Sequence, residues 1–388
     1  MILEIAKDIS DELIKIRRDL HKIPELEFEE FKTSTYIKSI LDKLEIEYEI
    51  LSGTGICAFL KGKKGPGKTI LIRADIDALP LEEKNEIDYK SIHDGKMHAC
   101  GHDAHITCLL GLCMILKKLD FNFSGNIKAV FQPAEEGQGG ALPMIQQGVM
   151  DNPAVNAALA LHVEPLCSKG TLQYKDGPIM ASPDDFKIIV KGIGGHGACP
   201  ENCINPIYAA SELINKIKNV VKDNFDNETS CVVSICTVNG GSFNNIIPDN
   251  VEITGTARSL DNITRSKIES ILQTYTKDIC LKNNCKYEFK FNKLYPPVIN
   301  NKKMNNIVIE AAKNIPDFTN IIELKKASMT GDDFSYFSQI VPSSYFKLGV
   351  GNDIINKPLH SSEFNIDENS LYLGASILCE SALKYLES

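Results

Sequence analysis

Hydrophobic positions along the first half of the chain follow two different spacings. Residues 2–20 and 29–44 repeat apolar side chains every three or four positions, which is typical of amphipathic helices. Beyond them, short apolar runs typical of strands alternate with helical stretches, at residues 48–51, 55–60, 69–74, 106–119, 126–131, 141–147 and 157–161. Strands that alternate with helices predict an α/β fold, here an open sheet with helices on both faces.

The pattern changes near residue 184 and changes back near residue 297. The segments between are predicted as strand 185–190, helix 206–221, strands 231–238 and 251–257, helix 263–281 and strand 287–291. This β-α-β-β-α-β order is the ferredoxin-like pattern. A helix, a strand and a helix then follow at residues 303–314, 344–349 and 370–386. We therefore expect an outer α/β domain of residues 1–183 and 297–388, with an α+β domain of residues 184–296 inserted in it.

Composition removes several classes of protein. The chain has 388 residues and a formal net charge of −9, which argues against a general nucleic-acid binder. Its longest apolar runs, such as residues 157–161, are too short to cross a bilayer. Residues 1–20 contain no signal-peptide core. Twelve cysteines without a CxxC pair are typical of a reduced chain, so we expect a cytoplasmic protein that acts without membrane or nucleic acid.

Two glycine-rich segments match nucleotide-binding patterns without the structural context that those patterns need. Residues 62–69 fit the P-loop string, but a β-type run follows where a helix should start. Residues 192–197 fit GxGxxG, yet Pro200 and Pro206 delay the next helix. Both segments are better interpreted as turns. A nucleotide-dependent oxidoreductase therefore remains only a remote alternative, which titration with nicotinamide cofactors would test.

The densest group of reactive side chains precedes the predicted helix at 106–119. It consists of His98, Cys100, His102, Asp103 and His105. Imidazole and thiolate together suit zinc or another borderline-soft divalent ion. A polar loop capped by Asp103 is the structural alternative. A nucleophilic Cys100 with His102 as its base is a chemical alternative, but two positions on one loop are a poor geometry for that pair.

Further candidate ligands follow the predicted strands. Glu135 and Glu136 are adjacent carboxylates, which repel each other unless a cation lies nearby. One could bind a metal while the other takes a proton from water. The residues at the carboxyl ends of predicted strands are Asp75, Asp77, Cys100, His102, Glu135, Glu136 and His162, with His360 as a candidate from the last segment. Since such strand ends form the ligand edge of an open α/β sheet, we expect a metal site there.

These motifs resemble one family over nearly the whole chain, the metal-dependent aminoacylase/carboxypeptidase superfamily. The resemblance is to its branch of N-acyl-L-amino acid amidohydrolases and hippurate hydrolases, which also contains plant indole-3-acetyl-amino acid hydrolases and N-acetyldiaminopimelate deacetylases. The matching segments are residues 17–25, 72–80, 97–105, 131–137, 162, 195–198, 245–248, 255–258 and 358–361. One position departs from the family pattern, since Asp332 stands where a glutamate is usual, and it is not assigned as a ligand.

The resemblance implies a role for each matching residue of the outer domain. It implies two divalent metal ions per subunit, zinc or manganese, with cobalt and nickel as alternatives. The implied ligands are Cys100, which would bridge the two ions, and His102, Glu136, His162 and His360. Glu135 matches the general base and acid, and Asp75 matches an aspartate that supports the metal site.

The inserted domain is implied to act as a lid and to form a homodimer. There, His196 matches a histidine that reaches the partner subunit's active site and stabilises the oxyanion, while Asn245 and Arg258 match substrate-holding residues. The implied reaction is hydrolysis of small N-acyl-L-amino acids, hippurate-like or N-acetylated, by a metal-activated water. A metallo-carboxypeptidase and an N-acetyldiaminopimelate deacetylase remain alternatives on the same site. A protein that only binds such ligands would not need Glu135.

Overall fold

The computed structural model describes residues 1–226 and 230–388, which divide into two compact units. Unit 1 comprises residues 1–177, 299–326 and 333–388. Unit 2 comprises residues 178–298 and 327–332, so its main segment interrupts the sequence of unit 1. The chain leaves unit 1 and returns to it along two short strands, β7 (Gly177–Met180) and β14 (Val298–Asn300), which pair with each other.

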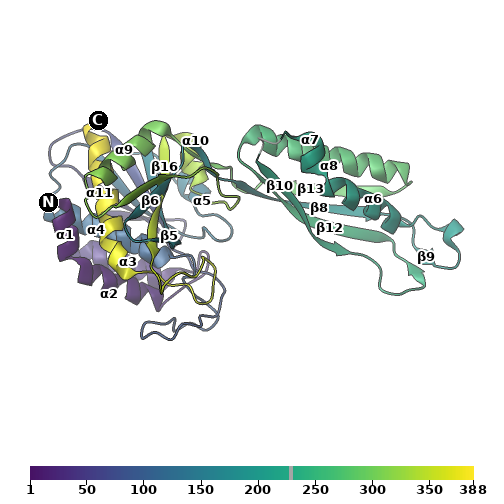
Figure 1. Ribbon diagram of the computed structural model, residues 1–388, viewed down its shortest axis with the longest axis horizontal. Coiled ribbons are helices and arrows are strands. Elements are labelled where there is room, and N and C mark those ends of the chain that lie inside the picture. Colours follow the sequence, from purple (N-terminus) through teal and green to yellow (C-terminus); the bar gives the residue numbers. More distant parts are fainter. Residues whose placement is uncertain (227–229) are drawn as a thin grey trace. The chain divides into compact units, whose positions relative to one another are not determined.

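Among the described residues, unit 1 is built on a mixed sheet of eight strands (Figure 1). Their order across the sheet is β1 (Glu47–Leu51), β2 (Gly55–Lys61), β4 (Asn126–Gln132), β3 (Thr69–Asp75), β5 (Ala157–Ser168), β16 (Ser343–Gly351), β6 (Thr171–Tyr174) and β15 (Asn320–Glu323). The four central strands, β4, β3, β5 and β16, are parallel. Their carboxyl ends therefore meet at one edge, as the sequence pattern predicts for an α/β fold.

Five of the described helices pack against this sheet and bury its centre: α3 (Phe31–Lys43), α4 (His102–Lys118), α9 (Lys302–Lys313), α10 (Ser335–Ile340) and α11 (Leu371–Glu387). Helices α1 (Ile2–Asp8) and α2 (Ser10–His21) pack on α4 and α11, and α5 (Ala141–Gln146) packs on α10. Every residue of β3 is buried, and α4 is buried on all sides from His102 to Leu116. A helix that is apolar all round belongs inside a protein. This explains why α4 can fix the position of the residues at its start.

Unit 2 has a four-stranded antiparallel sheet among its described residues, in the order β10 (Cys231–Asn239), β12 (Asn250–Ser259), β8 (Ser182–Lys191), β13 (Lys286–Asn292). Buried and half-buried residues alternate along β12 because one face of the sheet packs on helices α6 (Pro206–Lys218) and α8 (Asn262–Lys282). Unit 2 also contains α7 (Val220–Asn224), a short 3-10 helix (Pro200–Asn202) and a ribbon of β9 (Gly195–His196) with β11 (Ile246–Ile247).

Some element boundaries differ from those that the hydrophobic pattern predicts. The helix expected over residues 2–20 is divided at Ile9, and the one expected over 206–221 is divided between α6 and α7. Strand β5 continues to Ser168 because its polar second half still pairs with β16, which an apolar run cannot reveal. Within the described residues, no helix combines the length and hydrophobicity that crossing a membrane requires.

Candidate metal centre

Cys100 and His102 lie where the chain turns into α4. The sequence pattern predicts that they follow a strand, and this prediction is wrong. Residues 76–101 instead form an irregular segment with a single bridge between Leu79 and Met97. Gly101 makes the turn possible, with φ of +84°. A Cβ atom on this residue would lie 2.4 Å from Cγ2 of Val163, so the helix can start this close to β5 only with glycine.

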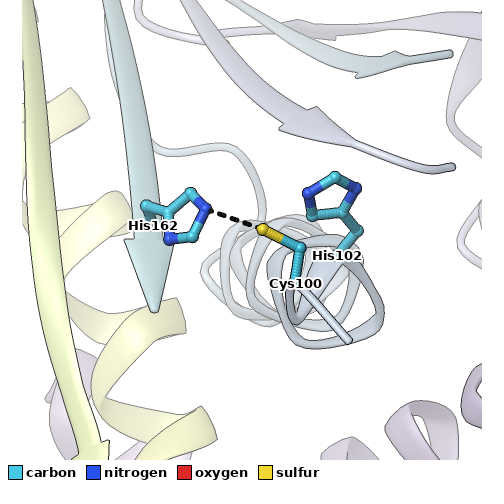
Figure 2. Close-up of side chains that lie close together, drawn as sticks. All are labelled: Cys100, His102 and His162. Carbon is cyan, nitrogen blue, oxygen red and sulfur yellow. Dashed lines mark hydrogen bonds between the residues drawn. The ribbon is translucent and has the colours of Figure 1, made fainter. Parts of the chain in front are cut away.

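His162 joins these two residues from the neighbouring strand. It lies within β5 and not at its end, which corrects the boundary predicted from sequence. Its Nε2 atom is 3.5 Å from Sγ of Cys100, and Figure 2 shows His102 on the other side of the same cysteine. The ligand atoms of Cys100, His102 and His162 all lie within 4.8 Å of one another, and all three residues are buried.

Hydrogen bonds fix which ring nitrogen of each histidine faces the centre. Nδ1 of His162 is 2.8 Å from the carbonyl oxygen of Val163, and Nδ1 of His102 is 2.9 Å from that of Asp77. A carbonyl oxygen only accepts, so Nδ1 carries a proton in both rings, and Nε2 is the nitrogen left to face the centre. Nε2 of His102 is buried and has no hydrogen-bond partner within the part of the chain that the structure describes.

Glu136 and His360 complete a second group around Cys100. Their ligand atoms and Sγ of Cys100 lie within 4.8 Å of one another, with Nε2 of His360 3.2 Å from Oε1 of Glu136. This approach to His360 is an ion-pair contact, because Oε1 of Glu136 is buried and accepts no hydrogen bond from residues 1–226 and 230–388. The backbone N–H of Glu136 donates to Oδ2 of Asp77 at 2.9 Å. The structure thus brings together all five residues proposed from sequence as ligands.

Two further carboxylates border this centre. Glu135 is buried, and its carboxylate lies within 4.8 Å of the ligand atoms of His102 and Glu136. Oδ2 of Asp75 is 3.6 Å from Nε2 of His102. Nη1 of Arg73 lies 2.6 Å from Oδ2 of Asp75, and Nδ1 of His105 lies 2.6 Å from its Oδ1. Asp75 therefore occupies a fixed position beside the ligands.

The electrostatics of the centre favour a cation. Burial raises the pKa of the Cys100 thiol, and the carboxylates of Glu136, Glu135 and Asp75 raise it further. Burial opposes the charged form of His102, but nearby carboxylates, Asp75 first among them, outweigh it and raise its pKa to about 10. A proton or a metal ion must balance this concentration of negative charge.

The residues present therefore fit divalent metal ions. Two buried atoms that make no hydrogen bond within the described residues, Nε2 of His102 and Oε1 of Glu136, face the same space. One sulfur, imidazole nitrogens and a carboxylate form the kind of donor set that borderline-soft divalent ions prefer. A buried polar atom costs about 1–3 kcal/mol if it stays unpaired, and a bound cation would remove that cost.

Asp77 was not assigned a role from the sequence, yet it contacts two of the candidate ligands. Its carbonyl oxygen and Oδ1 lie 2.9 and 3.2 Å from Nδ1 of His102, and its Oδ2 accepts the Glu136 N–H. Its position two residues beyond Asp75 was the only available signal. One of its contacts is to the backbone N–H of Glu136, a group that every residue other than proline has. The sequence therefore could not show this contact, which forms only when the two distant segments meet in the fold.

The candidate residues of unit 2 form two separate groups. His196 lies opposite Ile246 in the β9–β11 ribbon, next to Asn245, whose carbonyl accepts the Gly197 N–H at 2.8 Å. Nδ1 of His196 accepts from the Ala198 N–H, which leaves Nε2 to donate. The second group is Arg258, which lies in β12. This strand begins at Asn250, next to the ribbon, and Arg258 is eight residues further along it. At the rise of a β-strand, that is a separation of about 26 Å. Unit 2 therefore does not bring Arg258 beside His196.

Neither glycine-rich segment has the helix that nucleotide binding needs. Residues 62–68 form a turn between β2 and β3, and the residue after them starts a strand. Residues 192–197 contain the short strand β9, and α6 starts only at Pro206. The first segment is a turn, as the sequence indicates, whereas the second was predicted as a turn and instead forms one side of the β9–β11 ribbon.

Comparison with known proteins identifies the family. Residues 71–384 match the model of peptidase family M20/M25/M40. The chain belongs to this family. It is therefore a metal-dependent amidohydrolase, which confirms the resemblance seen in its motifs. Family members with known names align over nearly its whole length.

Three relatives show how broad the activities of similar family members are. The chain is 40% identical over 387 residues to thermostable carboxypeptidase 2 of Saccharolobus solfataricus, and the alignment covers 98% of this chain and 97% of the relative. It is 38% identical over 381 residues to hippurate hydrolase of Campylobacter jejuni, with 98% of both chains covered. A solved M20 structure from Bacillus subtilis, described as a dinuclear metal-binding peptidase, is 33% identical, with a TM-score of 0.86 and coverage of 98% and 99%.

Proposed function

We propose that this M20 protein hydrolyses the amide bond of N-acyl-L-amino acids, with Glu135 as the general base and acid. The observation that carries the proposal is the convergence of Cys100, His102, Glu136 and His162 in unit 1, with Glu135 beside them. Bound divalent cations would lower the pKa of a coordinated water and polarise the amide carbonyl. The fold would supply the positions, the proton transfer and the exclusion of water.

Five side chains would hold two divalent ions, zinc or manganese, with cobalt and nickel as alternatives: Cys100, His102, Glu136, His162 and His360. The two groups that share Cys100 support this assignment, since one sulfur can then contribute to both positions. The similarity to a dinuclear M20 peptidase supports the number of ions. Asp75 would support the site from beside His102, held there by Arg73 and His105.

Glu135 would move the proton that hydrolysis requires. It would take the proton from the attacking water and pass it to the nitrogen of the leaving amino acid as the C–N bond breaks. Its burial supports this role, because a carboxylate shielded from solvent exchanges its proton with the reacting groups and not with bulk water.

The residues of unit 2 would bind the substrate in a homodimer. Arg258 would pair with the substrate carboxylate, a geometry that guanidinium groups suit. Asn245 would also hold the substrate, and the N–H of His196 at Nε2 would stabilise the oxyanion in the partner subunit's centre. The separation of about 26 Å between His196 and Arg258 along unit 2 supports two different centres for the two residues.

A metallo-carboxypeptidase is the second candidate, because two relatives from Saccharolobus solfataricus, 40% and 39% identical, are named thermostable carboxypeptidases. Both reactions cleave an amide next to a carboxylate and would use the same residues. N-acetyldiaminopimelate is a further candidate substrate.

The twelve cysteines are all free in the described chain, which supports the expected reducing, cytoplasmic environment.

Metal replacement and one substitution test the proposal. Purified protein would be stripped with a strong chelator, resupplied with each candidate metal, and assayed on hippurate, N-acetyl amino acids, N-acetyldiaminopimelate and short peptides. The Glu135→Gln variant should keep its metal and lose about 10²–10⁴-fold in kcat. Glu47→Gln, at an exposed position of β1, serves as the matched control. Hydrolysis that survives chelation, or full activity of Glu135→Gln, would contradict the proposal.

A further inference from the structure

A buried carboxylate outside the candidate ligand set contacts the loop that carries Glu135 and Glu136. Glu30 directly precedes α3 and is 0% exposed. Its Oε1 accepts from the backbone N–H groups of Phe28 and Ala134, each at 3.0 Å, and its Oε2 accepts from Oγ1 of Thr54 at 2.5 Å. A carboxylate this deep in a protein needs such donors, so its conformation is well defined.

Ala134 has a backbone conformation that needs support. Its φ is +55°, a left-handed value that costs an alanine about 1–2 kcal/mol. Such a residue persists only when its surroundings hold it. The hydrogen bond from its N–H to Glu30 is one support, and the bond from the Gly139 N–H to its carbonyl oxygen is another. Since Glu135 and Glu136 follow directly, their direction depends on this turn.

A second glutamate from the same segment holds the other end of the loop. Oε2 of Glu27 accepts from the Gln138 N–H at 2.7 Å. Gly137 packs against the same carboxylate so closely that an added Cβ would lie 2.0 Å from its Oε2 atom. Residues 134–138 are therefore held at both ends by carboxylates of residues 27 and 30, neither of which belongs to a group of candidate ligands.

We propose that Glu30, with Glu27 at the far end of the loop, is a positioning residue that sets Glu135 and Glu136 for the metal centre. It acts through the N–H of Ala134 and touches neither substrate nor cation. Without this acceptor, Ala134 relaxes toward ordinary backbone angles and the two carboxylates move. The proposal rests on the proposed function, because that function assigns the roles of Glu135 and Glu136.

The experiment separates positioning from a contribution to stability alone. Glu30→Ala removes the acceptor, Glu30→Asp shortens it by one methylene, and Glu30→Gln keeps an oxygen for the Ala134 N–H. Thr54→Val is the matched control, because it removes only the partner of Oε2. Each metal-free variant would be titrated with zinc against a chromophoric chelator, unfolded in urea, and assayed for kcat and KM on the best substrate of the wild-type protein.

Positioning predicts a specific pattern across these variants. Glu30→Ala and Glu30→Asp should bind zinc about 10–100-fold more weakly. Their kcat should fall by a similar factor, since small misplacements of reacting groups cost about that much, with a smaller change in KM. Glu30→Gln should restore both to within about threefold. Thr54→Val should lose stability and keep wild-type zinc affinity and kcat.

Wild-type zinc affinity and kcat in both Glu30→Ala and Glu30→Asp would overturn the inference and leave Glu30 a structural residue. If Glu30→Ala does not fold, Glu30→Asp decides. Equal losses of affinity in Thr54→Val would also overturn it, since general loosening would then explain the effect. Glu136→Gln gives the reference for a lost ligand. Failure of the proposed function would instead show in the wild-type protein, as no zinc uptake or no turnover.

Discussion

At the scale of single residues, the candidate centre depends on side chains that are not ligands themselves. Asp77 holds His102 through Nδ1 and Glu136 through its backbone N–H, so one side chain orients two ligands from different segments. Such partners fix the ring orientation and strengthen the ligand. The types and clustering of Cys100, His102 and Glu136 pointed to a metal site. The tasks of Asp77 and Glu30 were not predictable, because backbone N–H groups carry no signature in the sequence.

Replacing Asp77 should weaken metal binding more than it weakens the fold. Asp77→Ala removes the acceptor oxygens of the side chain and should lower zinc affinity about 10–100-fold. Competition with a chromophoric chelator measures this directly. Asp94→Asn, at an exposed position of the segment before α4, is the control. Unchanged affinity in Asp77→Ala would contradict this prediction. It would show that the backbone carbonyl of residue 77 is enough to orient His102 without the carboxylate.

Glu30 should make the stability of the metal-free protein depend on pH. Burial raises its pKa from 4.5 to about 7, although bonds from Thr54 and Ala134 oppose the shift. Because the folded pKa exceeds the unfolded one, stability from this group is fully present below about pH 4.5 and is lost as pH rises through about 7. We therefore expect the free energy of unfolding of Glu30→Gln, measured in urea, to rise relative to that of wild type by about 2–3 kcal/mol between pH 5 and pH 8. A constant difference across this range would contradict the assignment.

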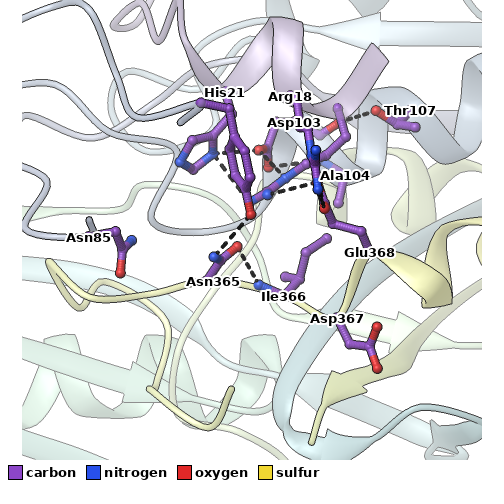
Figure 3. A network of polar contacts seen from close by, with 12 residues as sticks. Arg18, His21, Asn85, Asp103, Ala104, Thr107, Asn365, Ile366, Asp367 and Glu368 are labelled. Carbon is purple, nitrogen blue, oxygen red and sulfur yellow. Dashed lines mark hydrogen bonds and ion pairs between the residues drawn. The ribbon is translucent and has the colours of Figure 1, made fainter. Parts of the chain in front are cut away.

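At the scale of elements, α2 and α4 are joined by a network of buried charges (Figure 3). Arg17 and His21 of α2 lie 2.9 and 2.7 Å from the carboxylate of Asp103, and His21 also contacts Glu83 at 3.1 Å. All four side chains are buried. Burial and Arg17 oppose a charge on His21, but Asp103 and Glu83 outweigh them and raise its pKa. Since Asp103 follows His102, the network fixes the end of α4 that carries this ligand.

Two adjacent arginines of α2 should differ sharply in their contribution to stability. Arg17→Met leaves Asp103 buried without its main cation and should lower the free energy of unfolding by about 3–5 kcal/mol. Arg18 contacts Glu368 at 2.6 Å but is 46% exposed, so Arg18→Met should cost only about 0–1 kcal/mol. Urea denaturation of the two variants measures the difference. Similar losses for both would mean that the buried network does not stabilise the junction of α2 and α4.

The long elements followed from periodicity, whereas the short ones did not. Helix α4 and strand β3 were predicted because their apolar runs are long and regular. Strands β6 and β15 were missed: each has four residues, and they pair in parallel although about 150 positions separate them. The division between α1 and α2 at Ile9 was also missed, because apolar residues keep the helical spacing through it. Pairing and breaks of this kind depend on tertiary contacts.

At the scale of the whole molecule, the candidate residues are distributed unequally. The five candidate ligands, Glu135 and Asp75 all belong to unit 1, whereas His196, Asn245 and Arg258 belong to unit 2. Each unit also has its own hydrophobic core. Binding of metal should therefore add stability to unit 1 and leave unit 2 unchanged, because a ligand stabilises only the structure that binds it.

Calorimetry should show this as separate responses. We expect two thermal transitions in the metal-free protein, of which zinc raises only one, by an amount that grows with the logarithm of zinc concentration. Glu136→Gln should show a smaller increase at the same concentration, and Glu47→Gln a wild-type increase. A single transition that moves as a whole would indicate that the two units unfold together.

His360 differs from the other candidate ligands in its contact with solvent, since it is 53% exposed while Cys100, His102 and His162 are buried. An ion held partly by His360 has a short path to water, whereas one held between the two buried histidines must wait for the protein to open locally. We therefore expect a chelator to extract the metal in two kinetic phases, with His360→Ala accelerating only the fast phase. The protein would then pass through a half-loaded state, and the order in which its two ions arrive and leave would be set by the depth of their ligands.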